Sequence, residues 1–406
     1  MNKNDFTKKD QKYIRVGVDY FKIIEKQDRF NIIRHELKKW KKETIKDDYQ
    51  NKYFLDSIPK YDDFIIRPDN INPSKIINNC YNMYAEFPHK PKKGDWKWTK
   101  ILLEHIFGDQ YEQGIIYLQV LYLFPTQVLP IVVMVSETRE TGKSTFLDWL
   151  NMMFGANMTM IEPDVIGNNF NGEYATSNII GIDEGIIDKQ IAVEKVKALS
   201  TKKFISVNIK QVAHFKLPFF GKIIMASNNE DKFMRIDKKE IRFWVRKIPI
   251  PTIKNHNILH DMIEEIPAFL EHLTNLPKVN FQESRMVLTA NEIGNEYLDA
   301  VVKESRSGLY KEISELFQFY FENNNFLESE ATPKDIKEKF FAGDKNISIN
   351  YIRKVLVSEF NLKTPNKTER YNPFNSFDKI VGRPFTFLAS AFTDKIIIDD
   401  EDKPPF

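Results

Sequence analysis

A phosphate-binding loop is the clearest chemical feature of this sequence. Residues 136–147 read SETRETGKSTFL and lie between an apolar strand-like run, Ile131–Val135, and a helix-like run that begins at Ser144. In such a loop, successive backbone N–H groups surround a phosphate, and the N-terminus of the following helix adds partial positive charge. The order of strand, loop and helix therefore predicts a binding site for a nucleoside triphosphate.

Five consecutive residues of this loop are expected to hold the nucleotide. Gly142 lets the backbone approach the phosphate closely, Lys143 reaches the β- and γ-phosphates, and Ser144 offers its hydroxyl to Mg²⁺. Thr141 and Thr145 flank these residues and complete the set. The predicted cofactors are therefore ATP and Mg²⁺.

The loop departs from the usual pattern at its first position. Glu137 stands five residues before Gly142, where such loops usually carry glycine. A carboxylate at that point repels a triphosphate unless it is turned away, so we expect the first turn of the loop to differ. A purely structural strand–turn–helix is the alternative interpretation of the motif.

An acid pair follows the loop. Residues 178–185 read NIIGIDEG, an apolar strand that ends in Asp183 and Glu184, and Asp183 comes 40 residues after Lys143. Asp183 is expected to hold the metal and its water shell, and Glu184 to polarise the attacking water. Acids at strand ends also cap turns and helices, so the pair gains its specificity from the loop that precedes it.

Two further elements complete the candidate site. Asn228 lies near the end of the strand-like run Lys222–Asn229 and is expected to contact the γ-phosphate or its water, although asparagine is also a common turn former. In the run Glu240–Pro249, alternation places Arg242 and Arg246 on one face. They are interpreted either as edge-strand gatekeepers or, for Arg242, as a finger that reaches the nucleotide of a neighbouring subunit.

Composition limits the classes of protein that are possible. The 406 residues are enough for about two or three domains, and 42% hydrophobic with 29% charged residues is typical of a globular protein. The net charge of +2 means that any nucleic-acid contact must be local. Cys80 is the one cysteine, and the seven histidines are scattered, which argues against a disulfide framework or a zinc cluster.

The sequence also predicts a protein without a membrane partner. The charged N-terminus lacks the apolar stretch of a secretory signal, and no run reaches the roughly 18 apolar residues that span a bilayer. We therefore expect the chain to act in the cytoplasm of a bacterial or host cell.

Three regions are expected along the chain. Residues 1–95 form a charged helical region, in which Asp28–Lys46 is predicted as an amphipathic helix, solvated or in contact with nucleic acid. Residues 96–280 alternate helix-like and strand-like runs, the pattern of an α/β domain with a parallel sheet. Residues 281–406 form a small separate domain. The expected strands are Ile131–Val135, Met158–Ile161, Asn178–Ile182 and Lys222–Ala226.

In combination, the loop, the acid pair, the strand-end Asn228 and the following Arg242 resemble the superfamily 3 helicases, and most closely the primase–helicases of phages and plasmids. Flanking runs support the resemblance over roughly residues 85–280; they are LLEHIFGD at 102–109, FGAN at 154–157 and FN at 170–171. The resemblance implies an AAA+-like P-loop NTPase core and an ATP-dependent DNA helicase. It also implies a ring, expected to be a hexamer, with ATP bound between subunits and the N-terminal region as an assembly collar.

A further stretch resembles the DNA-gripping hairpin of this family. Residues 197–218 contain ISVNIK, and in papillomavirus-type replicative helicases the matching hairpin projects into the central channel and holds single-stranded DNA. The resemblance places Lys210 at the hairpin tip, Gln211 where those relatives carry histidine, and Lys203 along the path of the strand. An ordinary amphipathic hairpin is the alternative.

The C-terminal region is predicted to be winged-helix-like. Leu309–Phe321 is amphipathic, a second helix starts at Thr332, and Ser348 caps a third, Ile349–Phe360. Two later runs, Leu362–Tyr371 and Arg383–Leu388, are expected to form a strand–turn–strand wing. Such modules bind DNA or other proteins.

Three functions follow from these patterns. The first is a replicative DNA helicase, 3′-to-5′ if it shares the family's polarity, with a primase or polymerase as a possible partner because residues 1–90 show no acidic triad of a primase. The second is a non-unwinding DNA-dependent ATPase that acts as a replication initiator, loader or nucleic-acid sensor. Glu137 and the near-neutral charge motivate this second function. The third is a scaffold in which the nucleotide site is degenerate and the winged-helix region does the binding.

Overall fold

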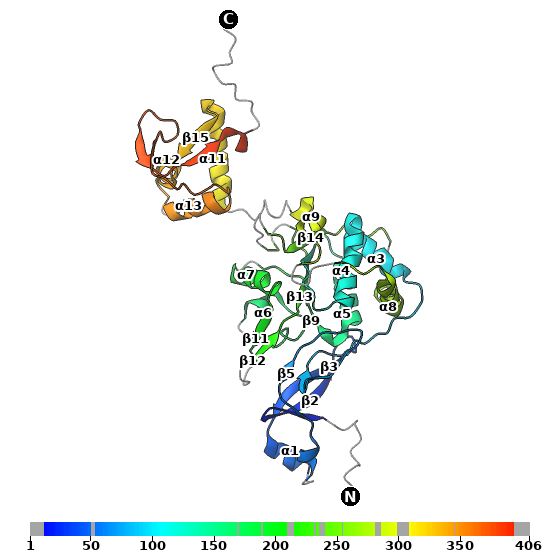
Figure 1. Ribbon diagram of the computed structural model, residues 1–406. Helices are drawn as coiled ribbons and strands as arrows, with labels where there is room; N and C mark the ends of the chain where they lie inside the picture. Colours follow the sequence, from blue (N-terminus) through cyan, green and yellow to red (C-terminus); the bar gives the residue numbers. More distant parts are fainter. Residues whose placement is uncertain are drawn as a thin grey trace. The chain divides into compact units, whose positions relative to one another are not determined.

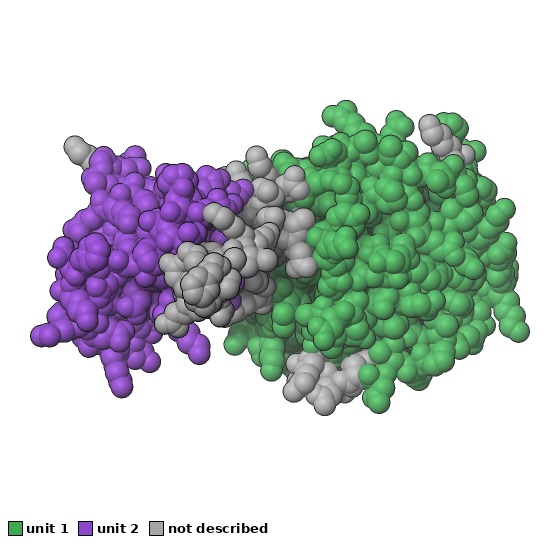
Figure 2. Space-filling view, turned by 90° about the horizontal axis from the view of Figure 1, so that it is seen from above, with its two compact units in different colours: residues 1–301 green, residues 302–406 purple. Residues whose placement is uncertain are grey.

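The computed structural model describes residues 12–49, 53–168, 170–187, 190–208, 215–230, 233–234, 240–253, 255–280, 286–298, 308–344 and 346–393. The chain divides into two compact units, residues 1–301 and 302–406, which are coloured separately in Figure 2. The second unit begins after the expected boundary at residue 281. The segment before it belongs to the first unit because Val287, Leu288 and Ile293 pack into that unit's main core.

A five-stranded parallel sheet forms the centre of the first unit (Figure 1). The strands stand in the order β14-β8-β13-β10-β9, and each neighbouring pair is parallel. This confirms the parallel sheet expected from the sequence. Their bounds are Ile131–Val135 (β8), Met158–Met160 (β9), Ile179–Ile182 (β10), Lys222–Ser227 (β13) and Phe243–Lys247 (β14).

Because the strands are parallel, their carboxyl ends lie at one edge of the sheet, the usual place for a ligand in such folds. Strand β13 separates β8 from β10, so the segments that follow these three strands are neighbours. Every residue of β8, β10 and β13 is buried, which explains why these strands read as uninterrupted apolar runs.

Helices cover the sheet in two groups (Figure 1). One group packs around α8, and its side of the sheet buries Trp149, Trp244 and Phe269 in the main core. Among the residues that the structure describes, no helix has both the length and the apolar character to cross a membrane. The groups are α3 (Lys97–Phe107), α4 (Tyr111–Leu123), α5 (Lys143–Phe154) and α8 (Ile258–Asn275), and opposite them α6 (Pro163–Gly167) and α7 (Gln190–Leu199).

The N-terminal region is a β-structure, and the predicted helix over Asp28–Lys46 is wrong for most of its length. Strands β1 (Tyr13–Val16), β2 (Asp19–Gln27), β3 (Ile33–Trp40) and β4 (Lys60–Tyr61) form a sheet in the order β3-β2-β1-β4. The first described helix, α1 (Lys42–Asp48), begins only after β3. The expectation of a helical region before the core is corrected accordingly.

Pairing with β2 accounts for this outcome. Two charges of β3 that suggest a solvated helix face make diagonal ion pairs with β2, although Lys38 and Arg34 lie directly opposite lysines. Lys39 Nζ is 2.8 Å from Asp19 Oδ2, and Lys26 contacts Glu36. Pairing with the nine-residue β2 therefore overrides the helical spacing of the apolar residues.

Short elements connect these parts. A three-stranded sheet, β5-β7-β6, follows the N-terminal sheet, and an antiparallel pair, β11 and β12, follows α7. The pairing of β11 with β12 confirms the expected hairpin strands, while the predicted tip residues Lys210 and Gln211 lie outside the described residues. The bounds are α2 (Phe54–Ser57), β5 (Phe64–Ile65), β6 (Ile76–Ile77), β7 (Cys80–Asn82), η2 (Gly108–Gln110), η3 (Gly155–Asn157), β11 (Phe204–Val207), β12 (Phe215–Pro218) and α9 (Ala290–Ile293).

Among its described residues, the second unit combines α-helices at the three expected places with short strands. Thr332 and Ser348 cap their helices, with Thr332 Oγ1 accepting from Asp335 N at 3.3 Å and Ser348 Oγ from Tyr351 N at 3.1 Å. The expected wing is corrected: β16, in the run 362–371, pairs with β17, whereas β18, in the run 383–388, pairs with β15. The bounds are α11 (Gly308–Asn324), β15 (Glu328–Ala331), α12 (Pro333–Phe340), α13 (Ile349–Ser358), β16 (Glu369–Tyr371), β17 (Ile380–Gly382), β18 (Phe385–Leu388) and η4 (Ala389–Ala391).

Candidate active site

The predicted phosphate loop joins β8 to α5. Two of its residues have left-handed backbone conformations, Glu140 with φ of 58° and Gly142 with φ of 89°. Glycine adopts such a conformation without steric cost, whereas other residues do so only where their surroundings hold them. The tight turn before α5 therefore requires a residue such as Gly142 at this position.

Lys143 lies at the centre of the loop and is only 5% exposed. Its ammonium donates to Thr141 Oγ1 at 3.1 Å and to the hydroxyl of Ser136. Burial lowers the pKa of Lys143, and the nearby carboxylates of Asp183 and Glu230 act in the opposite direction. The loop thus holds a lysine between its own hydroxyls and two acidic groups.

The end of β13 ties the loop to the acid pair. Ser136 N donates to Ser227 O at 3.2 Å, and Gly185 N donates to Ala226 O at 2.9 Å. Asn228, the next residue of this strand end, is exposed. The structure therefore brings the phosphate loop, Asn228 and the acid pair to one edge of the sheet.

The acid pair follows β10 in a constrained turn. Glu184 has φ of 52°, and its N–H donates to Asp183 Oδ1 at 3.0 Å. A left-handed conformation is uncommon for glutamate and is often found at functional sites. Asp183 is half-buried and Glu184 is exposed, so the two acids have different environments.

A third acid, Asp148, lies close to this pair. Burial raises the pKa of Asp148, the positive charge of Arg29 lowers it, and the negative charge of Asp183 raises it further. Asp148 stands on α5 four residues after Ser144, the spacing that places two side chains on one helix face. This spacing from Ser144 is the one sequence signal for Asp148, and Asp148 was not among the predicted site residues.

The site supplies few protein ligands for a metal. Among the described residues, no group of three or more His, Cys, Asp or Glu is arranged to hold a metal ion. Ser144 is exposed in the first turn of α5 and Asp183 follows β10, which leaves a hydroxyl and a carboxylate as oxygen donors. Such a sparse set fits Mg²⁺, which is usually held by one or two protein ligands together with phosphates and waters.

Two cavities lie near these residues, one bordered by the loop and the other by the acid pair. The smaller one, of about 630 Å³, is lined by α3, by Glu140 to Gly142 of the loop and by residues that follow β14. His105 of α3 lines it and contacts Thr141 O through Nε2 at 3.0 Å. The larger cavity, of about 1050 Å³, is lined by Asp183 and Glu184 and by the turn between β2 and β3.

Arg242 lies away from these residues. It precedes β14, and its carbonyl accepts from the N–H of Ile131, the first residue of β8. It is therefore at the amino edge of the sheet, opposite the phosphate loop. Its guanidinium makes a bidentate pair with Glu240 at 2.5 and 2.6 Å and donates to Lys197 O at 2.9 Å.

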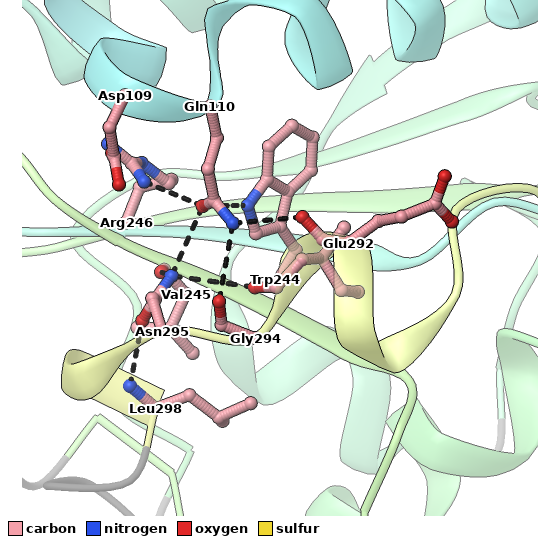
Figure 3. A network of polar contacts seen from close by, with 10 residues as sticks. Asp109, Gln110, Trp244, Val245, Arg246, Glu292, Gly294, Asn295 and Leu298 are labelled. Atoms are coloured by element: carbon pink, nitrogen blue, oxygen red, sulfur yellow. Dashed lines mark hydrogen bonds and ion pairs between the residues drawn. The ribbon is translucent and has the colours of Figure 1, made fainter.

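Arg246 belongs to a different, buried network (Figure 3). It donates to Gln110 Oε1 at 2.6 Å and to Asp109 Oδ1 at 2.9 Å, and the indole of Trp244 donates to the same Gln110 oxygen. Arg242 reaches α7 whereas Arg246 reaches η2, so the expected shared face of these arginines does not create a common site.

The first turn of the loop is fixed by a residue that the sequence analysis missed. Glu230 Oε1 accepts from the N–H of Glu137 at 3.0 Å, and Glu230 Oε2 pairs with Lys247 at 2.5 Å. Glu137 is exposed. The position without the usual glycine is thus held by a side chain from the segment after β13, for which no local sequence signal exists.

The hairpin strands carry charge and an aromatic ring at the surface. Lys203 is exposed just before β11, and Phe204 is 50% exposed. Lys216 of β12 lies over the Phe204 ring, with Nζ 4.8 Å from its centroid. Cations beside an exposed ring suit the backbone and bases of a single strand.

Comparisons with known proteins show what this chain is similar to. A family of unknown function (DUF5906) matches residues 134–245, which include the loop, the acid pair, Asn228 and Arg242. No curated protein matches the sequence.

The solved structures of the NrS-1 C-terminal region are similar over most of both chains. One apo structure has a TM-score of 0.61 at 14% identity and covers 93% of this chain and 95% of its own. An A-form apo structure has a TM-score of 0.59 at 15% identity, with coverages of 91% and 93%. At this identity, the likeness shows that the chain shares its fold with the NrS-1 C-terminal region.

Proposed function

We propose that this chain binds and hydrolyses ATP with Mg²⁺ and works as a superfamily 3-type replicative DNA helicase of a phage, plasmid or other mobile element. The observation that carries the proposal is the meeting of three segments at one sheet edge. Lys143 in its loop, Asn228 and the Asp183–Glu184 pair lie there on neighbouring strand ends. These are the groups that phosphoryl transfer to water requires.

The two cavities give the nucleotide a direction. The smaller cavity opens on the loop beside His105 and takes the base and ribose, since pockets of this size suit a small ligand. The larger cavity lies on the side of Asp183 and Glu184 and receives the γ-phosphate end. The triphosphate then runs along the loop between them, past Lys143 and the N-terminus of α5.

Each residue has a role in hydrolysis. Lys143 and the backbone N–H groups neutralise the β- and γ-phosphates, and Ser144 and Asp183 would hold Mg²⁺. Glu184 orients a water and accepts its proton as the water oxygen bonds to the γ-phosphorus. The bond from that phosphorus to the bridging oxygen breaks, and ADP and phosphate result. Asn228 positions the water or the γ-phosphate.

Arg242 supports assembly into a ring. It lies at the edge opposite its own phosphate loop, which removes it from its own nucleotide site and supports a role at the nucleotide of another subunit. A contact of one face with a different face of the next copy closes into a ring when the rotation fits, as in the hexamer that we propose. To act there, Arg242 must exchange Glu240 for phosphate.

Single-stranded DNA is the proposed track. Lys203, Lys216 and the exposed Phe204 offer charge and a stacking surface on β11 and β12, and Lys210 and Gln211 are proposed as the tip contacts. The second unit is proposed to be a winged-helix module for DNA or for a primase or polymerase partner.

A non-unwinding DNA-dependent ATPase, acting as initiator, loader or sensor, is the second candidate. The bidentate pair of Arg242 with Glu240 favours it, because this arginine is already held within its own chain.

Strand displacement on forked DNA, measured together with phosphate release, separates these candidates. The helicase proposal predicts that both occur and that both require Mg²⁺. ATP hydrolysis stimulated by single-stranded DNA without displacement would favour the second candidate. Absence of Mg²⁺-dependent hydrolysis with and without DNA would contradict both.

Mixing two inactive variants tests the role of Arg242. We expect Arg242→Ala and Lys143→Ala each to lose turnover, and their mixture to regain it. In a randomly mixed ring, about a quarter of the interfaces join an intact loop to an intact arginine. A mixture as inactive as its components would contradict the assignment of Arg242 to a neighbouring site.

A further inference from the structure

The turn between β2 and β3 is rigid and faces the larger cavity. The carboxylate of Asp28 accepts from Phe30 N at 2.9 Å and from Ile32 N at 3.1 Å, and Asn31 takes a left-handed conformation with φ of 62°. These hydrogen bonds hold the backbone of the turn without help from other parts of the chain.

Arg34 fastens this turn to the central domain. Its guanidinium pairs with Asp28 at 3.0 Å and donates to Met158 O at 2.7 Å and Asn151 Oδ1 at 3.0 Å. Asn151 belongs to α5 and Met158 to β9. The N-terminal sheet is thereby held along the helix that starts at the phosphate loop.

Arg29 stands on this turn and reaches the same helix. Its Nη2 is 3.4 Å from Asp148 Oδ1, and its side chain is 75% exposed. Asp148 follows Ser144 by one helical turn, and it interacts electrostatically with Asp183, which also interacts with Lys143. Two cations, Lys143 and Arg29, therefore lie around one pair of carboxylates.

The cavity connects Arg29 with the acid pair. Arg29, Asp183 and Glu184 line the same space of about 1050 Å³, on the side of the loop assigned to the γ-phosphate. An exposed ion pair at 3.4 Å contributes little, whereas a guanidinium binds phosphate oxygens with two parallel hydrogen bonds. The exposed guanidinium can therefore exchange Asp148 for phosphate.

We propose that Arg29 is a γ-phosphate-binding arginine that the N-terminal sheet supplies to the nucleotide site of its own chain. This inference rests on the proposed ATP site and adds a residue to it. Arg29 completes the charge around the γ-phosphate together with Lys143, and it makes the position of the N-terminal sheet sensitive to the presence of that phosphate.

The preference for a triphosphate over a diphosphate tests this proposal. For Arg29→Ala, we expect affinity for a non-hydrolysable ATP analogue to fall about tenfold, affinity for ADP to stay within about twofold, and kcat to fall about tenfold or more. Arg29→Lys should recover part of the preference, because lysine keeps the charge but not the planar fork. Lys26→Ala is the matched control, since Lys26 lines the same cavity but pairs with Glu36.

The alternative is that Arg29 only links the sheet to α5 through Asp148. In that case Asp148→Asn would reduce the ratio of analogue to ADP affinity as much as Arg29→Ala, which would overturn the proposal. An unchanged ratio in Arg29→Ala, or an equal loss in Lys26→Ala, would overturn it as well. Wild-type turnover that depends on Lys143 but not on Arg29 rejects this inference alone. Absence of wild-type turnover rejects the proposed function, and this inference with it.

Discussion

Two buried lysines at opposite edges of the central sheet show how differently the fold uses the same residue. Lys143, after β8, is 5% exposed, and Lys222, at the start of β13, is 4% exposed. Burial lowers the pKa of both, that of Lys222 to about 7. The two lysines differ in the groups that surround their ammonium groups. Lys143 lies near the carboxylates of Asp183 and Glu230 in a loop that borders a cavity of about 630 Å³, whereas Lys222 donates to the carbonyl of Pro125 beside a pocket of only about 20 Å³.

The comparison extends to the other polar groups of the two edges. At the carboxyl edge, Ser144, Glu184 and Asn228 are exposed. At the amino edge, Arg242 is bound to Glu240 and Lys197 O, and Asn178 donates to Pro125 O at 2.9 Å. Polar groups at one edge are open to a ligand, while those at the other hold the fold together. Each of the following substitutions tests one side of this difference.

Lys143→Ala should have the largest effect. Loss of the charge at the β- and γ-phosphates is expected to lower kcat/KM for ATP by about 10³-fold. The alanine leaves the main core untouched, so the melting temperature should stay close to that of the wild type. Full turnover in this variant would contradict the assignment of the phosphate loop.

Glu184→Gln tests the acid that we assign to the attacking water. The amide keeps the shape but cannot accept the proton, so we expect kcat to fall by about 10²-fold. Affinity for a non-hydrolysable analogue, measured by calorimetry, should remain. Equal losses of binding and kcat would show that Glu184 acts mainly through the metal or the fold.

Gln110→Leu tests whether Arg246, near the carboxyl end of β14, has a structural role although it lies at the edge of the sheet assigned to the nucleotide. The Gln110 side chain accepts from Trp244 at 2.8 Å and Arg246 at 2.6 Å and donates to Glu292 O at 3.0 Å (Figure 3). Removing it leaves a buried guanidinium short of a partner, so unfolding in urea should become easier by about 2 kcal/mol. A stable variant that has lost ATP turnover would instead place this network in the site.

Lys222→Met should stabilise the protein in a pH-dependent way. Because the folded pKa of Lys222 is about 7 against 10.5 in the unfolded chain, the unfolded state binds more protons between these values. Wild-type stability therefore gains up to roughly 1.4 kcal/mol per pH unit from this group as the pH rises above 7, and the burial penalty is greatest below 7. The methionine variant lacks this pH-dependent contribution to the free energy of unfolding.

Urea unfolding at pH 7 and pH 9 measures the difference. The advantage of Lys222→Met over the wild type is expected to shrink at pH 9. Asn178 still donates to the Pro125 carbonyl in the variant, so that acceptor keeps a partner. An advantage that does not depend on pH would mean that Lys222 is not neutral at high pH in the folded protein.

The central sheet could be predicted from the sequence because its strands are apolar on both faces. The run Ile131–Val135 matches β8 to the residue, and the site residues of the carboxyl edge follow directly from such strand ends. Local patterns were sufficient wherever a strand, its turn and the next helix are consecutive in the chain. The caps at Thr332 and Ser348 were predictable for the same reason.

Contacts between distant segments could not be predicted in this way. The charges of β3 suit a solvated helix equally well, and the strand follows only from the pairing of β3 with β2, which the β3 sequence alone does not show. Arg29 and Asp148 are 119 residues apart, and Glu230 meets Glu137 across 93 residues. One sequence gives no spacing from which such pairs follow, since they depend on how separate elements pack.

The most direct test compares the two lysines in one experiment. Mg²⁺-dependent binding of a fluorescent ATP analogue would be titrated for the wild type, Lys143→Ala and Lys222→Met at neutral pH. We predict that Lys222→Met binds like the wild type and that Lys143→Ala loses binding by about 10²-fold or more. Equal affinity in the two variants, whether both bind or both fail, would contradict the assignment of the nucleotide site to the carboxyl edge of the sheet.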